Sequence, residues 1–131
     1  MKTDLQDAKR ALRGYLKAYR ICQDQAAEIA RQIEKGEVLD AVKDMLLQAK
    51  REFETHCRNV NLILGYLSQG STMYRVVSLR YLQGMNMKDV AGKLGYSVGH
   101  CDNVESMAID YLVSRSQVME LIGKKDRHEK K

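Results

Sequence analysis

The chain has 131 residues and carries 22 lysines and arginines against 17 aspartates and glutamates, a formal net charge of +5. It contains no proline or tryptophan, and strong helix formers are frequent, so we expect an all-α protein of one domain or one small domain with a helical extension. The basic balance permits an anionic partner. No apolar run approaches the ~20 residues of a membrane span, which predicts a cytoplasmic protein without membrane contact.

Cysteine and histidine are too scattered to form a metal site. Cys22, Cys57 and Cys101 lie far apart on apolar faces and read as buried thiols in a reducing compartment. No pair of cysteines or histidines has metal-ligand spacing, so we expect no cofactor. The sequence also lacks a glycine-rich phosphate loop, a Ser/His/Asp set in recognisable context and an acidic cluster, which argues against an enzyme.

Residues 1–69 have the pattern of a long antiparallel helical hairpin, similar to a coiled coil. Apolar residues recur at alternating spacings of three and four from Leu5 to Ile33, which predicts one uninterrupted helix over about Thr3 to Lys35. Gly36 breaks the pattern, and it resumes from Leu39 to Leu67. These apolar residues form a seam along each helix, and the two seams can pair within one chain or between the two chains of a homodimer.

The charged residues on the first helix of the hairpin allow two interpretations. Four cations share one helix face, and we favour a solvated surface over a basic binding stripe; they are Lys9, Arg13, Lys17 and Arg20. His56 lies on the apolar seam and is interpreted as a packing residue without a functional role. The apolar end of the second helix, around Ile63 and Leu64, is expected to join the hairpin to the C-terminal module.

Residues 70–123 have the pattern of a helix-turn-helix module, and they follow a break at Gly70. A helix over Met73 to Leu82 is predicted first. Two short helices then meet at Gly95, with Asn86 and Ser97 at their N-caps. Past the second of these, the pattern allows either one helix as far as Leu121 or a break near residues 114–116.

Tyr74 to Leu112 resembles the region-four helix-turn-helix of bacterial sigma factors. The likeness rests on the run Leu79 to Gly84 and on a second set that comprises Val90, Ala91, Leu94, Gly95, Tyr96 and Ser97. The sequence is most similar to the small sigma-like regulators of phages and prophages of the RinA and ArpU type. This resemblance implies a transcriptional regulator that binds double-stranded promoter DNA, with RNA polymerase as a protein partner.

The resemblance assigns two sets of DNA-contacting residues. Arg75, Lys88 and Lys93 are candidates for phosphate contacts, which act through charge and do not depend on base sequence. Base edges in the major groove would be read from the outward side of the second helix of the motif. The candidates for base reading are Ser97, Val98, Gly99, His100, Asp102, Asn103 and Ser106.

The second helix of the motif differs in charge from the corresponding helix of sigma-like regulators. Tyr96 to Val113 contains Asp102, Glu105 and Asp110 but no lysine or arginine, where sigma-like relatives usually carry cations. Glu105 and Asp110 can face away from DNA and leave base reading intact. Alternatively, the module docks a protein, which would make the chain an assembly protein or a small terminase-like subunit. A disordered basic tail is expected over 124–131.

Overall fold

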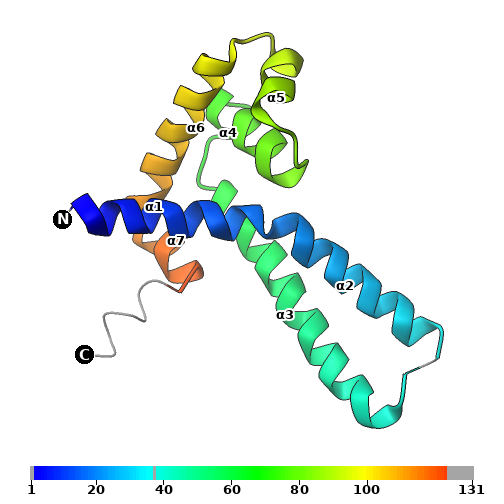
Figure 1. Cartoon of the computed structure of the whole chain (residues 1–131). Coiled ribbons are helices and arrows are strands. Elements are labelled where there is room, and N and C mark those ends of the chain that lie inside the picture. Colours follow the sequence, from blue (N-terminus) through cyan, green and yellow to red (C-terminus); the bar gives the residue numbers. More distant parts are fainter. Residues whose placement is uncertain (1, 37, 124–131) are drawn as a thin grey trace.

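The structure is a computed structural model, and it describes residues 2–36 and 38–123. The described residues are all-α, as predicted, and contain no strand. The predicted tail over 124–131 lies outside them. In chain order the elements are α1 (Lys2–Lys17), α2 (Tyr19–Glu34), α3 (Asp40–Leu64), α4 (Thr72–Val77), a single π-helical turn η1 (Ser78–Leu82), α5 (Met87–Leu94), α6 (Val98–Val113) and α7 (Ser116–Leu121) (Figure 1).

The predicted first helix is long but bent, because α1 and α2 meet at Ala18. His56 of α3 reaches into this bend, where its Nε2 donates to the carbonyl oxygen of Tyr15 at 2.7 Å and its ring stacks on the Tyr15 ring at 3.8 Å. A side chain that enters the hydrogen-bond ladder of a helix is a known cause of bending. The histidine therefore packs, as predicted, and also contacts the backbone at the point where the helix changes direction.

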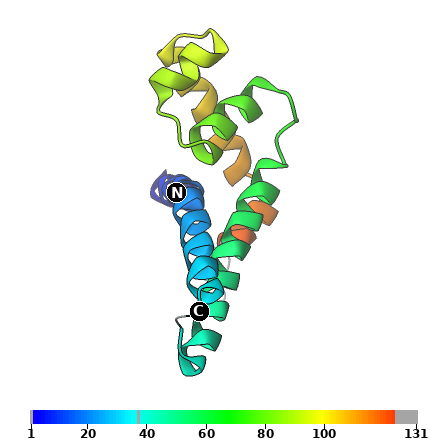
Figure 2. The same cartoon turned by 90° about the vertical axis from the view of Figure 1, so that its right-hand side faces the viewer.

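Only the second half of the bent helix forms the predicted hairpin, in which α2 lies antiparallel to α3 (Figure 2). Cys22, Ala26 and Ile29 of α2 are buried along this contact. The prediction that Leu39 and Val42 belong to the buried seam is wrong, since they are 74% and 40% exposed. Two helices bury only one line of side chains, and no third element among residues 2–36 and 38–123 covers Leu39 and Val42 at the turn of the hairpin.

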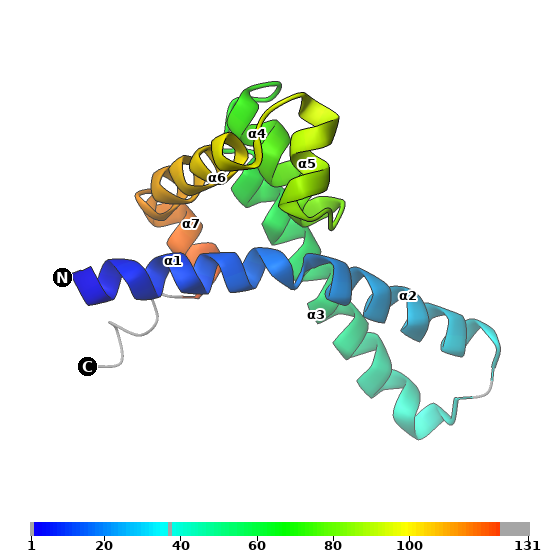
Figure 3. The ribbon, with the colours of Figure 1, turned by 45° about the horizontal axis from the view of Figure 1, so that its top comes forward.

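The first half, α1, leaves α3 and crosses the C-terminal half of α6 (Figure 3). Leu12 and Leu16 of α1 are fully buried in the main hydrophobic core. That core draws on both halves of the chain and comprises Leu12, Leu16, Val60, Ile63, Leu64, Leu67, Val77, Tyr81, Ala108, Ile109, Leu112 and Val118. Ile63 and Leu64 thus join the hairpin to the C-terminal module, as the sequence indicated.

A second, smaller core holds the helix-turn-helix module together. It comprises Val76, Val90, Ala91, Cys101 and Val104, from α4, α5 and α6. Past α6 the chain breaks at Ser114 and continues as α7, which is the second of the two predicted alternatives. None of the helices over residues 2–36 and 38–123 is long and apolar enough to span a membrane.

The Leu79 to Gly84 run ends in a close contact with α2. Gly84 has φ = +73°, and a β-carbon at this residue would lie 2.6 Å from Cδ of Arg20. The Arg20 guanidinium donates to the carbonyl oxygens of Leu82 at 3.4 Å and Gln83 at 3.0 Å, where the helical turns end. Carbonyl groups at a helix C-terminus favour a cation. The positive φ of Gly84 favours glycine here, and a larger residue would in addition displace the Arg20 side chain.

Candidate nucleic-acid interface

The turn between α5 and α6 has the local features that the sequence predicted. Gly95 adopts the left-handed conformation with φ = +77°, and its N–H and that of Tyr96 both donate to the carbonyl of Ala91. The Asn86 side chain accepts from the N–H of Asp89 at 2.9 Å, and Ser97 accepts from the N–H of His100 at 3.1 Å. Both helix N-termini are therefore capped, which fixes where α6 begins.

All seven predicted base-reading residues are exposed on the first half of α6 or at its cap. Helical periodicity places Gly99, Asn103 and Ser106 in one outward row, which we call the recognition row. Val98 and Asp102 lie on one flank of this row. His100 lies on the other flank, where its ring meets the Tyr96 ring edge-on at 4.8 Å. The structure thus brings Gly99, Asn103 and Ser106 together on one face of α6, whereas Val98 and His100 point about 160° apart around the helix and do not share that face.

The three predicted phosphate contacts are exposed but spread out. Arg75 lies on α4, Lys88 in the first turn of α5 and Lys93 in its last turn. Five residues separate the two lysines, so they point about 140° apart around the helix. They therefore do not form one compact basic patch, and together they can serve only a partner that extends over several elements, as a nucleic-acid backbone does.

Glu105, one of the three acids of α6, faces inward. Its side chain is 10% exposed and accepts two hydrogen bonds from Arg13 of α1, from Nε at 3.0 Å and from Nη2 at 2.9 Å. The Tyr81 hydroxyl donates to the same carboxylate at 2.6 Å. These three side chains, from α1, η1 and α6, form a buried polar cluster that we call the Arg13–Glu105–Tyr81 cluster. A charge at this depth is tolerated because it is paired and hydrogen-bonded.

Two members of this cluster, Tyr81 and Arg13, have raised pKa values. Burial and the hydrogen bond to Glu105 raise the pKa of the Tyr81 hydroxyl. The hydrogen bond to Glu105 likewise raises the pKa of the Arg13 guanidinium. Both groups carry their protons at neutral pH already at their ordinary pKa values, and the contacts with Glu105 favour this protonated state further.

Asp110, the second acid, is also engaged by α1, through an ion pair of 2.6 Å with Lys9. Asp102 is exposed, and no ion pair involves it among residues 2–36 and 38–123. The local charge of −3 in the sequence is thus largely compensated by cations that lie about 90 residues earlier in the chain. Of the two acids that were expected to face away from DNA, Glu105 faces the core, whereas Asp110 lies on the exposed side of α6 and is paired there with Lys9.

The favoured reading of the four cations on the first helix as a solvated face holds only in part, since Lys17 and Arg20 are exposed whereas Lys9 and Arg13 are partly buried. Lys9 and Arg13 bind carboxylates of α6, and Arg20 binds carbonyl groups next to η1. Lys17 is exposed. The sequence already indicated that these cations share one helix face, because they are spaced three or four residues apart. Such spacing identifies a shared face, but not what that face contacts.

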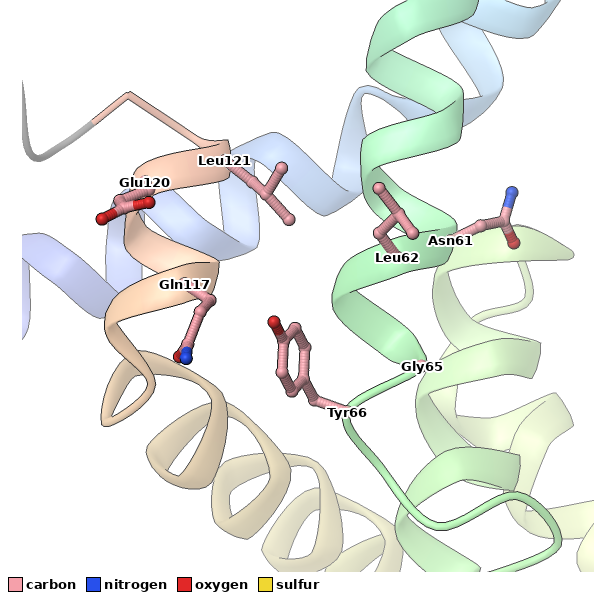
Figure 4. A pocket seen from close by; sticks show the side chains of 7 residues that line it. All are labelled: Asn61, Leu62, Gly65, Tyr66, Gln117, Glu120 and Leu121. Carbon is pink, nitrogen blue, oxygen red and sulfur yellow. The ribbon is translucent and has the colours of Figure 1, made fainter.

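A groove away from the helix-turn-helix was missed by the sequence reasoning. It has a volume of about 650 Å³ and lies between the end of α3 and α7 (Figure 4). Tyr66 points into the space between the two helices, with Leu62 and Leu121 beside it and the amide of Gln117 opposite. The guanidinium carbon Cζ of Arg115, which lies between α6 and α7, is 5.1 Å from the centroid of the Tyr66 ring. This is a cation–π distance. No sequence motif marks this groove, because its lining residues come from two separate segments of the chain.

Comparison of the chain with protein-family models, with curated proteins and with solved structures finds no match.

Proposed function

We propose that this protein is a DNA-binding transcriptional regulator that inserts the N-terminal half of α6 into the major groove of double-stranded DNA. The observation that carries the proposal is the recognition row, Gly99, Asn103 and Ser106, exposed on a helix whose start is fixed by a left-handed glycine and a serine cap. A single helix with small polar residues on its outer face fits the width of the groove. Phage or prophage origin, and RNA polymerase as a protein partner, belong to the same proposal through the sigma-like resemblance.

Electrostatics support DNA over a protein as the partner of this surface. Glu105 is buried and Asp110 is paired with Lys9, which leaves Asp102 as the unpaired acid of the described part of α6. Asp102 has a use in the groove, because a carboxylate can accept from the amino group of cytosine. The exposed Arg75, Lys88 and Lys93 add positive charge on the neighbouring helices. Positive charge near a base-reading row is the footprint expected of a DNA-binding module.

The direct test is selection of bound duplexes from a random library at two salt concentrations, followed by sequencing. A regulator should enrich one sequence motif, and the enrichment should persist at the higher salt because base contacts do not release counterions. Unselective binding that disappears with salt, or no binding, would overturn the proposal in favour of protein docking.

Two matched variants test the assigned roles on the selected sequence. Asn103→Ala should weaken binding to that sequence by about 1–3 kcal/mol and leave nonspecific binding unchanged, because it removes a base contact. Lys88→Ala should weaken binding to all duplexes alike and lower the salt slope by about 0.9, because it removes one phosphate contact. Fluorescence anisotropy titrations measure both quantities. Lys43→Ala, at the exposed start of α3, is the control of equal charge change.

A second candidate function is self-assembly through the turn of the hairpin. Leu39 and Met45 are 74% and 71% exposed there, beside the exposed Val42. Exposed apolar side chains that lie together favour association. Sedimentation equilibrium should show a homodimer that Leu39→Ser/Met45→Ser converts to a monomer. A wild-type protein that stays monomeric at high concentration would exclude this candidate.

A further inference from the structure

The N-terminal half of α1 lies beside the recognition helix on the side that α4 and α5 leave open. In Figures 1 and 3 these two helices lie on one side of α6, and the N-terminal end of α1 extends past the other. Helix α1 is held on α6 by the Arg13–Glu105–Tyr81 cluster and by the ion pair between Lys9 and Asp110. Helix α1 is therefore fixed at the edge of the surface that would meet DNA.

Helical periodicity continues the recognition row along α6 as far as Asp110, which contacts α1. Asp110 follows Asn103 by seven residues and Ser106 by four, so it lies in line with them one turn further along α6. The Lys9 ammonium lies 2.6 Å from the Asp110 carboxylate, which puts a cation of α1 at the end of the row. Arg10 is the next residue, and its side chain is 81% exposed.

We propose that α1 is a second DNA-contacting element, in which the exposed Arg10 binds a phosphate of the strand that passes the C-terminal end of the recognition row. This inference rests on the proposed function. A helix in the major groove, which is about 12 Å wide, has a phosphate backbone on either side of it. The cations of α4 and α5 lie on one side of α6, and α1 supplies positive charge on the other. Charge complementarity thus assigns the second backbone to α1.

Asp7 offers a substitution whose expected effect on DNA affinity is opposite to that of Arg10→Ala. Its carboxylate lies 3.4 Å from the Arg10 guanidinium, so it competes with a phosphate for the same cation. Arg10→Ala should lower both the affinity for any duplex and the salt slope, the latter by about 0.9. Asp7→Asn should raise the affinity, because it releases Arg10 and removes a negative charge.

The experiment is a salt titration of duplex binding by the full chain, with the duplex obtained from the selection. Lys43→Ala and Asp44→Asn are the controls, since both exposed residues lie near the start of α3, at the far end of the hairpin from α6. Thermal unfolding checks that the exposed substitutions leave the fold unchanged. A larger effect at Arg10 and Asp7 than at the two controls supports the proposal.

Equal effects at α1 and at the controls, with Asn103→Ala still impairing sequence-specific binding, would overturn the role of α1 and leave the proposed function standing. A wild-type chain that binds no duplex would overturn the proposed function itself. The two failures therefore give different results in the same titration.

Discussion

Glu105→Ala is expected to lower the free energy of unfolding by about 2–4 kcal/mol. The substitution leaves the Arg13 guanidinium and the Tyr81 hydroxyl without their acceptor, and breaking a fully buried ion pair costs about 3–5 kcal/mol. The expected value is lower because the Arg13 side chain is 35% exposed and can regain water. A loss of this size is a large fraction of the ~5–15 kcal/mol that stabilises a typical domain. Urea denaturation followed by circular dichroism measures it.

Asp110→Asn is the matched control on the same helix. Its pair with Lys9 is surface-exposed on the Asp110 side, at 56%, and such pairs contribute about 0–1 kcal/mol. The compensated variant Arg13→Met/Tyr81→Phe/Glu105→Leu should recover most of the stability, because it leaves no unpaired polar group in the core. Equal, small losses for Glu105→Ala and Asp110→Asn would contradict the burial of the Arg13–Glu105–Tyr81 cluster.

Leu12→Ala is expected to cost about 2–5 kcal/mol of unfolding free energy. Leu12 is fully buried in the main core, where α1 meets α3 and α6, so truncation leaves a cavity between elements from both halves of the chain. The same substitution at Leu46 of α3 should cost less, because Leu46 is half-buried in the hairpin. Both residues occupy similar positions in the apolar pattern of the sequence.

The comparison of these two leucines tests the fold directly. Urea denaturation of Leu12→Ala and Leu46→Ala gives the two losses under identical conditions. If the hairpin alone carried the stability of the N-terminal half, both substitutions would cost similar amounts. The packing of α1 on α6 instead requires the larger loss at Leu12.

Stability and proposed function are linked through α1. The cluster that anchors α1 on α6 also removes Glu105 from the surface next to the recognition row, and Lys9 pairs with Asp110 at the end of that row. Packing of the N-terminal helix thus compensates two of the three acids that make α6 unusual for its sigma-like resemblance.

The sequence by itself determined the helices and the turn of the helix-turn-helix module. Asn86, Gly95 and Ser97 act on groups within a few residues of themselves, so their effects can be read from local spacing. The exposure of all the predicted base-reading residues followed from helical periodicity, since the apolar residues of α6 fix which side faces the core.

Only the tertiary structure decided what the first helix covers. Its apolar pattern predicted one uninterrupted helix paired with the second helix of a hairpin, whereas His56 contacts the backbone at the bend and α1 packs on α6. Arg13 and Glu105 are 92 residues apart in the chain. Periodicity shows which face of a helix is buried, but the partner of that face depends on long-range packing, which no local spacing encodes.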